Sequence, residues 1–429
     1  MIDINELRQD PDKVRKNIKL KFQDHKLPLV DEVIELDKKH RALKQQGDEL
    51  RASRNSLSAE IGKLMKEKKM EEANKIKEQV KQNNDKTLEI EKEEEIIGER
   101  IKKIMMTIPN IIDPDVPIGE DDSKNVQRLT VGEAKPATFE IPYHADILES
   151  LNGLDLDSAR RTSGNGFYFL TGDIARLHSA ILSYARDFMI NKGFTYCIPP
   201  FMIRSDVVTG VMSFSEMENM MYKIEGEDLY LIGTSEHSMI GRFKDTIVKE
   251  ENLPILLTSY SPCFRKEVGA HGIEERGIYR VHQFEKQEMI VICKPEESRE
   301  WYNKMWQISS EFFKTLDIPH EVMECCSGDL ADLKVKSCDI NAWSPRQNKY
   351  FGELGSCSNL TDAQARRLGI RFKTDKGTVF AHTLNNTVVA PPRMLIAFLE
   401  NNINADGSVN IPVALRPYMG GKTQISVKN

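Results

Sequence analysis

The residues with the clearest chemistry lie between Cys263 and Glu288, in the stretch CFRKEVGAHGIEERGIYRVHQFEKQE. Arg265 and Arg280 carry planar guanidinium groups, which suit phosphate or carboxylate. Phe284 offers a flat ring on which a purine can stack, and a carboxylate such as Glu267 can accept a hydrogen bond from an exocyclic amine. These side chains together could bind ATP and an amino acid. The alternative is a solvated hairpin with ordinary surface ion pairs.

The segments that flank this stretch predict how its side chains are positioned. LPILLTSYSPCF (253–264) precedes it and QFEKQEMIVIC (283–293) closes it, and both have the composition of β-strands. Gly269, Gly272 and Gly277 interrupt the segment between them. We therefore expect an antiparallel pair of strands that presents the polar side chains on one sheet face, beside a long loop.

The pattern FR-x-E…RG-x-x-R-x-HQF-x-K-x-E resembles motif 2 of the class II aminoacyl-tRNA synthetases, in the form found in seryl-tRNA synthetases. The resemblance extends over essentially the whole chain and implies an α+β protein. It implies an N-terminal antiparallel α-helical coiled-coil hairpin, followed by a class II catalytic domain built on an antiparallel sheet. It also implies ATP-dependent attachment of serine to tRNA(Ser) through a seryl-adenylate, by a cytoplasmic homodimer.

The resemblance assigns ATP to motif 2, to the strand ELGSCSN (353–359) and to the start of a later helix. Arg265 would neutralise the α-phosphate and Arg393 the γ-phosphate, and these two are the predicted catalytic residues. Glu353 and Ser356 would hold Mg²⁺, which prefers hard oxygen ligands. The predicted ATP-binding residues are Arg265, Lys266, Glu267, Val281, Phe284, Glu353, Leu354, Gly355, Ser356 and Arg393.

The resemblance assigns the serine substrate to Thr234-Ser235-Glu236, to Glu288 and to the strand that begins HTLNNT. An ammonium group donates three hydrogen bonds, which a carboxylate and a hydroxyl can accept. Glu288 would accept from the substrate hydroxyl, because leaving a buried acceptor unpaired with alanine costs about 1–3 kcal/mol. Thr234 could equally be the N-cap of a helix. The predicted serine-binding residues are Thr234, Ser235, Glu236, Arg265, Glu288, Asn385 and Thr387.

Two segments of the chain depart from the family pattern. The family commonly has Asn-Gly-Ser-Gly where this chain has Asn385-Asn386-Thr387-Val388, and Pro391-Pro392 replaces a glycine before the arginine. Gly233 and His237 stand where proline and valine are usual. Lost glycines remove backbone freedom, so the sequence leaves open how Asn386 and the two prolines affect amino-acid specificity.

A heptad pattern predicts two long helices near the N-terminus. The absence of proline from Leu29 to Pro109 and the polar break at Lys66–Lys69 favour an antiparallel hairpin with arms of roughly 50–55 Å, over a dimerisation coiled coil. By resemblance this hairpin contacts tRNA, and Lys66, Lys68 and Lys69 at its tip suit phosphate; a merely solvated charge run is the alternative. The predicted seam is Leu29, Val33, Leu36, His40, Leu43, Gly47, Leu50, Arg54, Leu57, Ile61 and Leu64, then Val80, Asn83, Thr87, Ile90, Glu94, Ile97, Ile101 and Ile104.

The predicted domains are a tRNA-binding domain over 1–107, a proline-rich acidic linker over 108–130 and the catalytic domain over 131–429. Within the last, a helix over 175–193 and one strand over 193–203 resemble motif 1, which builds the family's dimer interface. We expect the residues that bind serine and ATP to come entirely from Thr234 onward.

Composition limits the alternatives. The net charge of −6 does not suggest a general nucleic-acid or DNA binder. A polar N-terminus and the lack of a long apolar run predict neither a signal peptide nor a membrane span. Seven cysteines without a C-x-x-C pair make a disulfide framework or zinc site unexpected, and Cys325-Cys326 is expected in a buried strand.

Two rival functions stay open at this point: an adenylate-forming paralogue that loads a carrier protein, and a catalytically idle synthetase-like RNA-binding protein. The long arm argues against the first and the retained arginines and carboxylates against the second. The sequence also leaves open charging of tRNA(Sec), the tRNA identity determinants and the oligomeric state.

Overall fold

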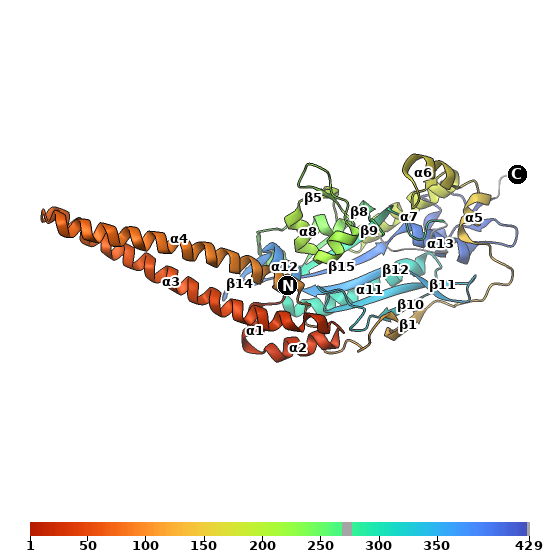
Figure 1. Ribbon diagram of the computed structural model, residues 1–429. Helices are drawn as coiled ribbons and strands as arrows, with labels where there is room; N and C mark the ends of the chain where they lie inside the picture. The colour runs from red at the N-terminus through yellow and green to blue at the C-terminus, as the bar shows by residue number, and fades with distance from the viewer. Residues whose placement is uncertain (268–276, 427–429) are drawn as a thin grey trace. The chain divides into compact units, whose positions relative to one another are not determined.

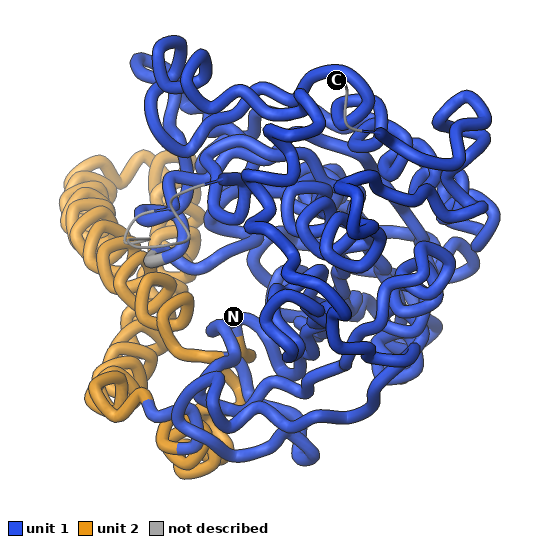
Figure 2. The backbone as a smooth tube through the Cα atoms, turned by 90° about the vertical axis from the view of Figure 1, so that its right-hand side faces the viewer, with its two compact units in different colours: residues 1, 20–22, 110–429 blue, residues 2–19, 23–109 orange. Residues whose placement is uncertain are grey.

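The computed structural model describes residues 1–267 and 277–426, and the chain forms two compact units (Figure 2). The helical unit comprises residues 2–19 and 23–109, and the sheet unit comprises residues 1, 20–22 and 110–429. Gly269 and Gly272 of the predicted loop lie outside the described residues. No helix in the described part of the chain is both long enough and apolar enough to cross a membrane.

The helical unit is dominated by two long helices that lie side by side (Figure 1). At 1.5 Å per residue the 40-residue α3 extends about 60 Å. Every predicted seam residue is buried or half-buried, so the predicted hairpin is confirmed. The helices of this part of the chain are α1 (Ile4–Gln9), α2 (Pro11–Leu20), α3 (Leu27–Lys66) and α4 (Met70–Thr107).

Ion pairs between α3 and α4 accompany the apolar seam. Arg51 lies 2.8 Å from Glu91, and Lys39 lies 2.6 Å from Glu93. Water screens such exposed pairs, so the apolar seam is the main source of stability. The turn between the helices contains one residue in the left-handed backbone conformation, Lys68, with φ of 62°.

The sheet unit is built on an eight-stranded sheet in which every neighbouring pair is antiparallel except β4 and β8. The predicted antiparallel sheet of the catalytic domain is confirmed (Figure 1). Its strands, in spatial order, are β1 (Val126–Val131), β10 (His320–Glu324), β11 (Lys336–Ser344), β12 (Lys349–Thr361), β15 (His382–Val389), β9 (Gln283–Cys293), β8 (Ile255–Phe264) and β4 (Thr195–Tyr196).

Shorter elements surround this sheet. The other strands are β2 (Leu154–Asp155), β3 (Phe169–Leu170), β5 (Met202–Ile203), β6 (Tyr230–Leu231), β7 (Ile247–Lys249), β13 (Arg371–Thr374), β14 (Gly377–Phe380), β16 (Val409–Asn410) and β17 (Gln424–Ile425). The helices are α5 (His144–Ser150), α6 (Leu156–Ser163), α7 (Gly172–Asn191), α8 (Ser205–Val211), α9 (Phe214–Met220), α10 (Ser235–Gly241), α11 (Ser298–Thr315), α12 (Ala363–Leu368) and α13 (Pro391–Asn402).

The two faces of the sheet pack against different helices, as the side chains of β9 show. Met289 and Val291 join the core that includes α7, α11 and α13. Ile290 and Ile292 point to the opposite face and join the core formed with α8, α10 and α12. Because side chains alternate along a strand, Glu288 shares the second face, which therefore carries an apolar end and a polar end.

Two expectations about local structure are wrong. The single strand predicted over 193–203 is two short strands, β4 and β5, because Pro199 and Pro200 between them have no N–H to donate to a ladder. Cys325 and Cys326 are buried as expected, but they follow β10 instead of lying in it. The helix predicted over 175–193 is confirmed as α7.

The chain between the long helices and β1 packs within the sheet unit. The side-chain amide of Asn110 donates to the carbonyl oxygens of Leu333 and Leu360, each at 3.1 Å. Val126 to Val131 then form an edge strand of the main sheet. This segment therefore supports the end of the sheet at which the candidate site lies.

Candidate active site

The predicted antiparallel pair around the first motif is confirmed as β8 and β9, which remain paired as far as Phe264 opposite Gln283. Arg265 follows β8 directly. Its Nε donates to the carbonyl oxygen of Gly233 at 3.3 Å, and its guanidinium carbon lies 5.2 Å from the centre of the Phe284 ring. The hairpin thus holds a cation and an aromatic face together at the start of its loop.

A row of polar side chains crosses four neighbouring strands on the same sheet face. Glu288 on β9 pairs with Thr387 on β15, and Ser356 on β12 pairs with Asp339 on β11. The pairing of Cys357 with Asn386 brings Ser356 next to Thr387. These four side chains line one cavity of about 330 Å³, which we call cavity B.

A second cavity of about 110 Å³, cavity A, adjoins cavity B. Arg265, Lys286, Glu353 and Thr387 line both. Of the predicted ATP-binding residues, cavity A is lined by Arg265, Glu267, Val281, Phe284, Glu353, Leu354, Gly355 and Arg393. Of the predicted serine-binding and metal-binding residues, cavity B is lined by Thr234, Glu236, Arg265, Glu288, Glu353, Ser356, Asn385 and Thr387.

Of the residues predicted to bind ATP, serine or the metal, two line neither of these cavities. Ser235 is fully buried in the first turn of α10. The backbone N–H of Lys266 donates to the carbonyl oxygen of Met220 at 3.0 Å. Lys266 therefore ties the start of the hairpin loop to α9 through its main chain.

Thr234 is a helix N-cap, the alternative role for this residue, and its side chain also contacts a predicted serine-binding residue. It caps α10, accepting from the N–H of Glu236 at 3.4 Å, and its hydroxyl donates to Glu288 Oε2 at 2.8 Å. Lys286 forms a buried ion pair with the same carboxylate. These two protein contacts therefore hold the Glu288 carboxylate in one orientation at the wall of cavity B.

Glu236 is the second carboxylate on the β9 side of cavity B. Its Oε1 accepts from Gln364 Nε2 and from Asn385 Nδ2, both at 2.8 Å. Burial, followed by the nearby charge of Glu288, raises the pKa of Glu236 to about 7. This carboxyl consequently changes its charge near neutral pH, where an incoming ammonium group would favour the ionised form.

His237 and Asn386 are two positions at which the sequence departs from the family pattern, and the structure shows where each side chain lies. His237 lines cavity B, and burial, then Lys286 and Arg265, lower its pKa to about 3, so the ring is neutral. Asn386 faces the other side of the sheet, where its amide donates to Met305 O and Ser309 Oγ on α11. Asn386 thus contributes to packing beneath the site and does not line the cavity.

The prolines before Arg393 begin α13. They occupy its first two positions, where a missing N–H leaves no helical bond unmade. Arg393 Nη1 donates to Glu353 Oε2 at 3.1 Å, and its guanidinium carbon lies 5.0 Å from the centre of the Tyr279 ring. The prolines therefore help to set the position of the predicted phosphate-binding arginine.

Glu353, one of the residues predicted to hold a metal, lies near three cationic side chains. Burial acts to raise its pKa, but Arg393, then Lys334 and Arg265, outweigh burial and lower it, so the group is ionised. Asp339 lies beside Ser356 across the strands, and burial, then Glu353, raise its pKa to about 6. Two carboxylates and a hydroxyl form a set of hard oxygen donors that fits Mg²⁺.

Several residues of this site were not predicted from the sequence. The residues that bind serine and ATP are expected from Thr234 onward, and the cavity itself extends further, because Val211, Met212, Glu216 and Met220, around α8 and α9, also line cavity B. Lys286 could have been predicted from the sequence, because it is the lysine of the motif HQF-x-K-x-E. No sequence pattern indicated Asp339 or Lys334, because only strand pairing and loop geometry bring them to the cavity.

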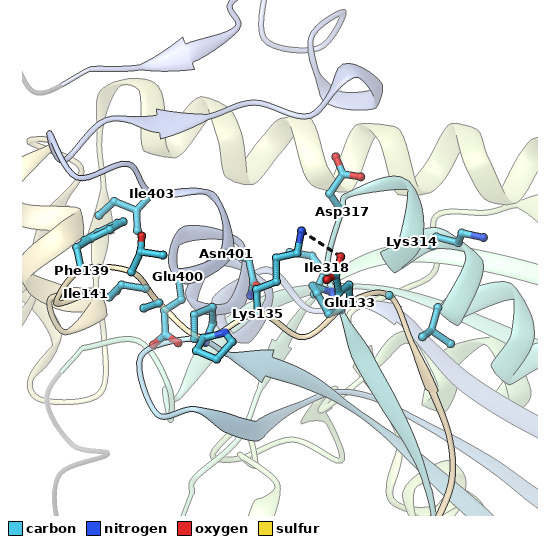
Figure 3. Close-up of a pocket in the computed structure, with 17 residues that line it drawn as sticks. Glu133, Lys135, Phe139, Ile141, Lys314, Asp317, Ile318, Glu400, Asn401 and Ile403 are labelled. Carbon is cyan, nitrogen blue, oxygen red and sulfur yellow. Dashed lines mark ion pairs between the residues drawn. The ribbon is translucent and has the colours of Figure 1, made fainter.

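A larger cavity of about 620 Å³ lies elsewhere in the sheet unit, between the segment 131–141 and the ends of α11 and α13 (Figure 3). It contains none of the predicted site residues. Lys135 and Glu133 in its wall pair with each other at 3.0 Å. Volume alone therefore does not identify the site, whereas the convergence of predicted side chains on cavities A and B does.

The predicted tRNA contacts belong to the helical unit. Lys66 ends α3, and Lys68 and Lys69 form the turn before α4. All three are exposed, and Lys69 pairs with Glu67 at 2.9 Å. Lys66 and Lys68 thus have exposed ammonium groups at the end of the hairpin.

Comparisons with known proteins agree with this arrangement. Residues 1–112 match the family model described as "Seryl-tRNA synthetase N-terminal domain", and residues 220–402 match "tRNA synthetase class II core domain (G, H, P, S and T)". A serine–tRNA ligase of Thermococcus sibiricus is 42% identical, with 100% of this chain and 98% of that protein covered.

Solved structures give the same result. Seryl-tRNA synthetase from Pyrococcus horikoshii, complexed with ATP, aligns with a TM-score of 0.93 at 37% identity and covers both chains completely. Cytoplasmic serine–tRNA ligase from Naegleria fowleri, in complex with AMP, aligns with a TM-score of 0.88 at 32% identity, over 100% of this chain and 99% of that one.

Proposed function

The chain belongs to the seryl-tRNA synthetases, and from this premise we propose that it attaches serine to tRNA(Ser) in two ATP-dependent steps. The observation that supports the proposal best is the shared wall of cavities A and B. Arg265 stands in that wall between the predicted ATP-binding residues and the predicted serine-binding residues. One guanidinium group can therefore contact an α-phosphate and an amino-acid carboxylate together.

In the first step, an oxygen of the serine carboxylate attacks the α-phosphorus of ATP. The bond from that phosphorus to the bridging oxygen breaks, and its electron pair leaves with pyrophosphate. No protein nucleophile is needed, since positioning and charge stabilisation suffice for such chemistry. Arg265 neutralises the α-phosphate, Phe284 and Glu267 hold the adenine, and Arg393 binds the γ-phosphate.

Serine is selected by the two carboxylates of cavity B. Glu236, together with Thr234, binds the ammonium group, while Glu288 and Thr387 receive the side-chain hydroxyl. Glu288 is already oriented by Thr234 and Lys286, so its acceptor capacity is directed into the cavity. Alanine would leave that acceptor unpaired, which costs about 1–3 kcal/mol.

Mg²⁺ is the metal that the oxygen donors fit. Glu353 and Ser356 would hold it, with Asp339 beside them. When bound, the ion neutralises phosphate charge. Arg393 already contacts Glu353 at 3.1 Å, so the arginine and this carboxylate are positioned together.

In the second step, the 3′-terminal ribose hydroxyl of tRNA attacks the seryl carbonyl and AMP leaves. The long hairpin supports this step, since Lys66, Lys68 and Lys69 at its end suit phosphate contacts. We propose that the protein acts in the cytoplasm as a homodimer through α7 and the segment that follows it.

The test is ATP–pyrophosphate exchange with each amino acid in turn, followed by charging of tRNA. We expect exchange with serine alone and transfer to tRNA(Ser). A protein without exchange would be the catalytically idle RNA-binding alternative. Exchange without transfer to tRNA would favour the paralogue that loads a carrier protein, which the match to the seryl-tRNA synthetase N-terminal domain disfavours.

A further inference from the structure

Lys334 lines cavity B, although nothing in the sequence patterns assigned it a role. It comes from the loop before β11, and its backbone N–H bonds back to the carbonyl oxygen of Ala331 at 3.1 Å. The other basic side chains in this wall have protein partners. Lys286 pairs with Glu288, and Arg265 donates to Gly233 and lies over Phe284. Within the described residues, the Lys334 ammonium makes neither a hydrogen bond nor an ion pair.

The surroundings of Lys334 are acidic. Cys325 Sγ and one carboxylate oxygen each of Asp329 and Asp339 lie within 4.8 Å of one another in the same wall. Burial acts to lower the pKa of Lys334, but Asp339, then Cys325 and Glu353, outweigh burial and raise it. The group is therefore a charged ammonium at neutral pH, without a direct partner, facing a cavity.

The position of Lys334 indicates which part of the reaction it serves. The serine-binding carboxylates Glu236 and Glu288 lie on the β9 side of cavity B, where Lys286 already supplies a positive charge. Lys334 belongs to the β11 and β12 side, with Asp339, Ser356 and Glu353. That side carries Glu353 and Ser356, the residues fitted to the metal, and Glu353 contacts Arg393, the predicted phosphate-binding arginine. An anionic phosphate oxygen is therefore the ligand that the Lys334 ammonium suits.

We propose that Lys334 is a further catalytic residue of serine activation, which binds the phosphate oxygens of ATP that depart as pyrophosphate. The inference rests on the proposed function. As the serine carboxylate bonds to the α-phosphorus, the bond to the bridging oxygen breaks and negative charge collects on pyrophosphate. A positioned ammonium stabilises this charge more in the transition state than in the ground state. Mg²⁺ held by Glu353 and Ser356 would supply further positive charge, so losing Lys334 should raise the Mg²⁺ concentration that the reaction needs.

The experiment compares Lys334→Met and Lys334→Arg with the wild-type protein. The matched control is Lys304→Met, since Lys304 is an exposed lysine of α11 that pairs with Glu300 outside the cavity. Serine-dependent ATP–pyrophosphate exchange is measured against pyrophosphate, serine and Mg²⁺ concentration. Calorimetry gives the affinity for a non-hydrolysable ATP analogue with Mg²⁺, and melting curves monitor folding.

For Lys334→Met we expect kcat/KM for pyrophosphate to fall about 10²-fold, the loss typical of a single charge-stabilising donor. The Mg²⁺ concentration for half-maximal exchange should rise, and the analogue should bind more weakly. KM for serine and the melting temperature should match the control, and Lys334→Arg should retain most activity.

Three results would overturn the inference: unchanged pyrophosphate kinetics and analogue affinity, a defect confined to KM for serine, or an arginine variant as impaired as the methionine variant. If the methionine variant does not fold, Lys334→Gln is measured in its place against the same outcomes. Absence of serine-dependent exchange in the wild-type protein would instead contradict the proposed function itself.

Discussion

The helical unit and the sheet unit both hold many charged side chains, but in opposite ways. Between α3 and α4, Lys39 and Glu93 remain 57% and 47% exposed although they pair at 2.6 Å. In the sheet unit, the side chains of Lys286 and Glu288 are only 8% and 2% exposed. Water screens the first pair, whereas the second depends on protein partners for its stability.

This difference predicts where the substitution of a single charged residue will have a large effect. On the hairpin, stability comes from the apolar seam, and an exposed charge matters only when a partner such as RNA arrives. At the cavities, each buried charge sets the orientation or the pKa of its neighbours, as Glu288 does for Glu236. Substitutions should therefore have large local effects in the sheet unit and small, salt-dependent effects at the end of the hairpin.

The largest effect is expected for Arg265→Ala. This change removes the guanidinium group from the wall shared by the two cavities. Serine-dependent exchange should fall by about 10²–10³, since a preorganised donor at developing charge typically contributes that much. The melting temperature should stay close to that of the wild-type protein. Near-normal exchange by the folded variant would show that this half-buried charge is not required for serine activation.

The next largest effect is expected when the helical unit is shortened and the sheet unit is left intact. Residues 42–92 are replaced by a short Gly/Ser turn, so that the helices are joined near the Lys39–Glu93 pair and the Arg8–Asp37 pair is kept. Serine activation should remain within about twofold, while kcat/KM for tRNA charging should fall about 10²-fold through lost contacts to RNA. If the shortened protein charges tRNA normally, the hairpin is a structural coiled coil and not a tRNA-binding arm.

A moderate effect concerns pH and Glu236. Its pKa is raised to about 7 by burial and then by Glu288, so the carboxyl is protonated below pH 7 and loses the charge that attracts ammonium. In the free enzyme, kcat/KM for serine should drop about fivefold from pH 7 to pH 6. Glu236→Gln should be weaker at pH 8 and lose this dependence. A variant that keeps the same pH profile would assign the titration to another group.

The smallest effect is expected at the end of the hairpin. Lys66, Lys68 and Lys69 are changed together to glutamine, which leaves the seam intact. Binding of tRNA should weaken several-fold, and the slope of log affinity against log salt should decrease by about one for each lysine that contacts phosphate. Exchange with serine should be unaffected. An unchanged salt slope would mean that these lysines form only a solvated surface.

Local patterns in the sequence determined much of this molecule. The heptad spacing predicted the two long helices, because apolar residues recurring on one helical face must be covered wherever the helices lie. The segments around Cys263–Glu288 predicted β8 and β9, since strand composition and glycine breaks are also local signals. The ordered motifs identified Arg265, Glu353 and Arg393 as candidates before any contact was known.

Tertiary structure alone decided which neighbours these residues have. Asp339 reaches Ser356 by pairing of β11 with β12, and Lys334 reaches the same cavity through the geometry of a loop. Asn386 turns toward α11, away from the site, because alternation along β15 assigns it to the opposite face. Strand register and loop geometry join residues distant in the chain, so no local pattern specifies which charges will share a cavity.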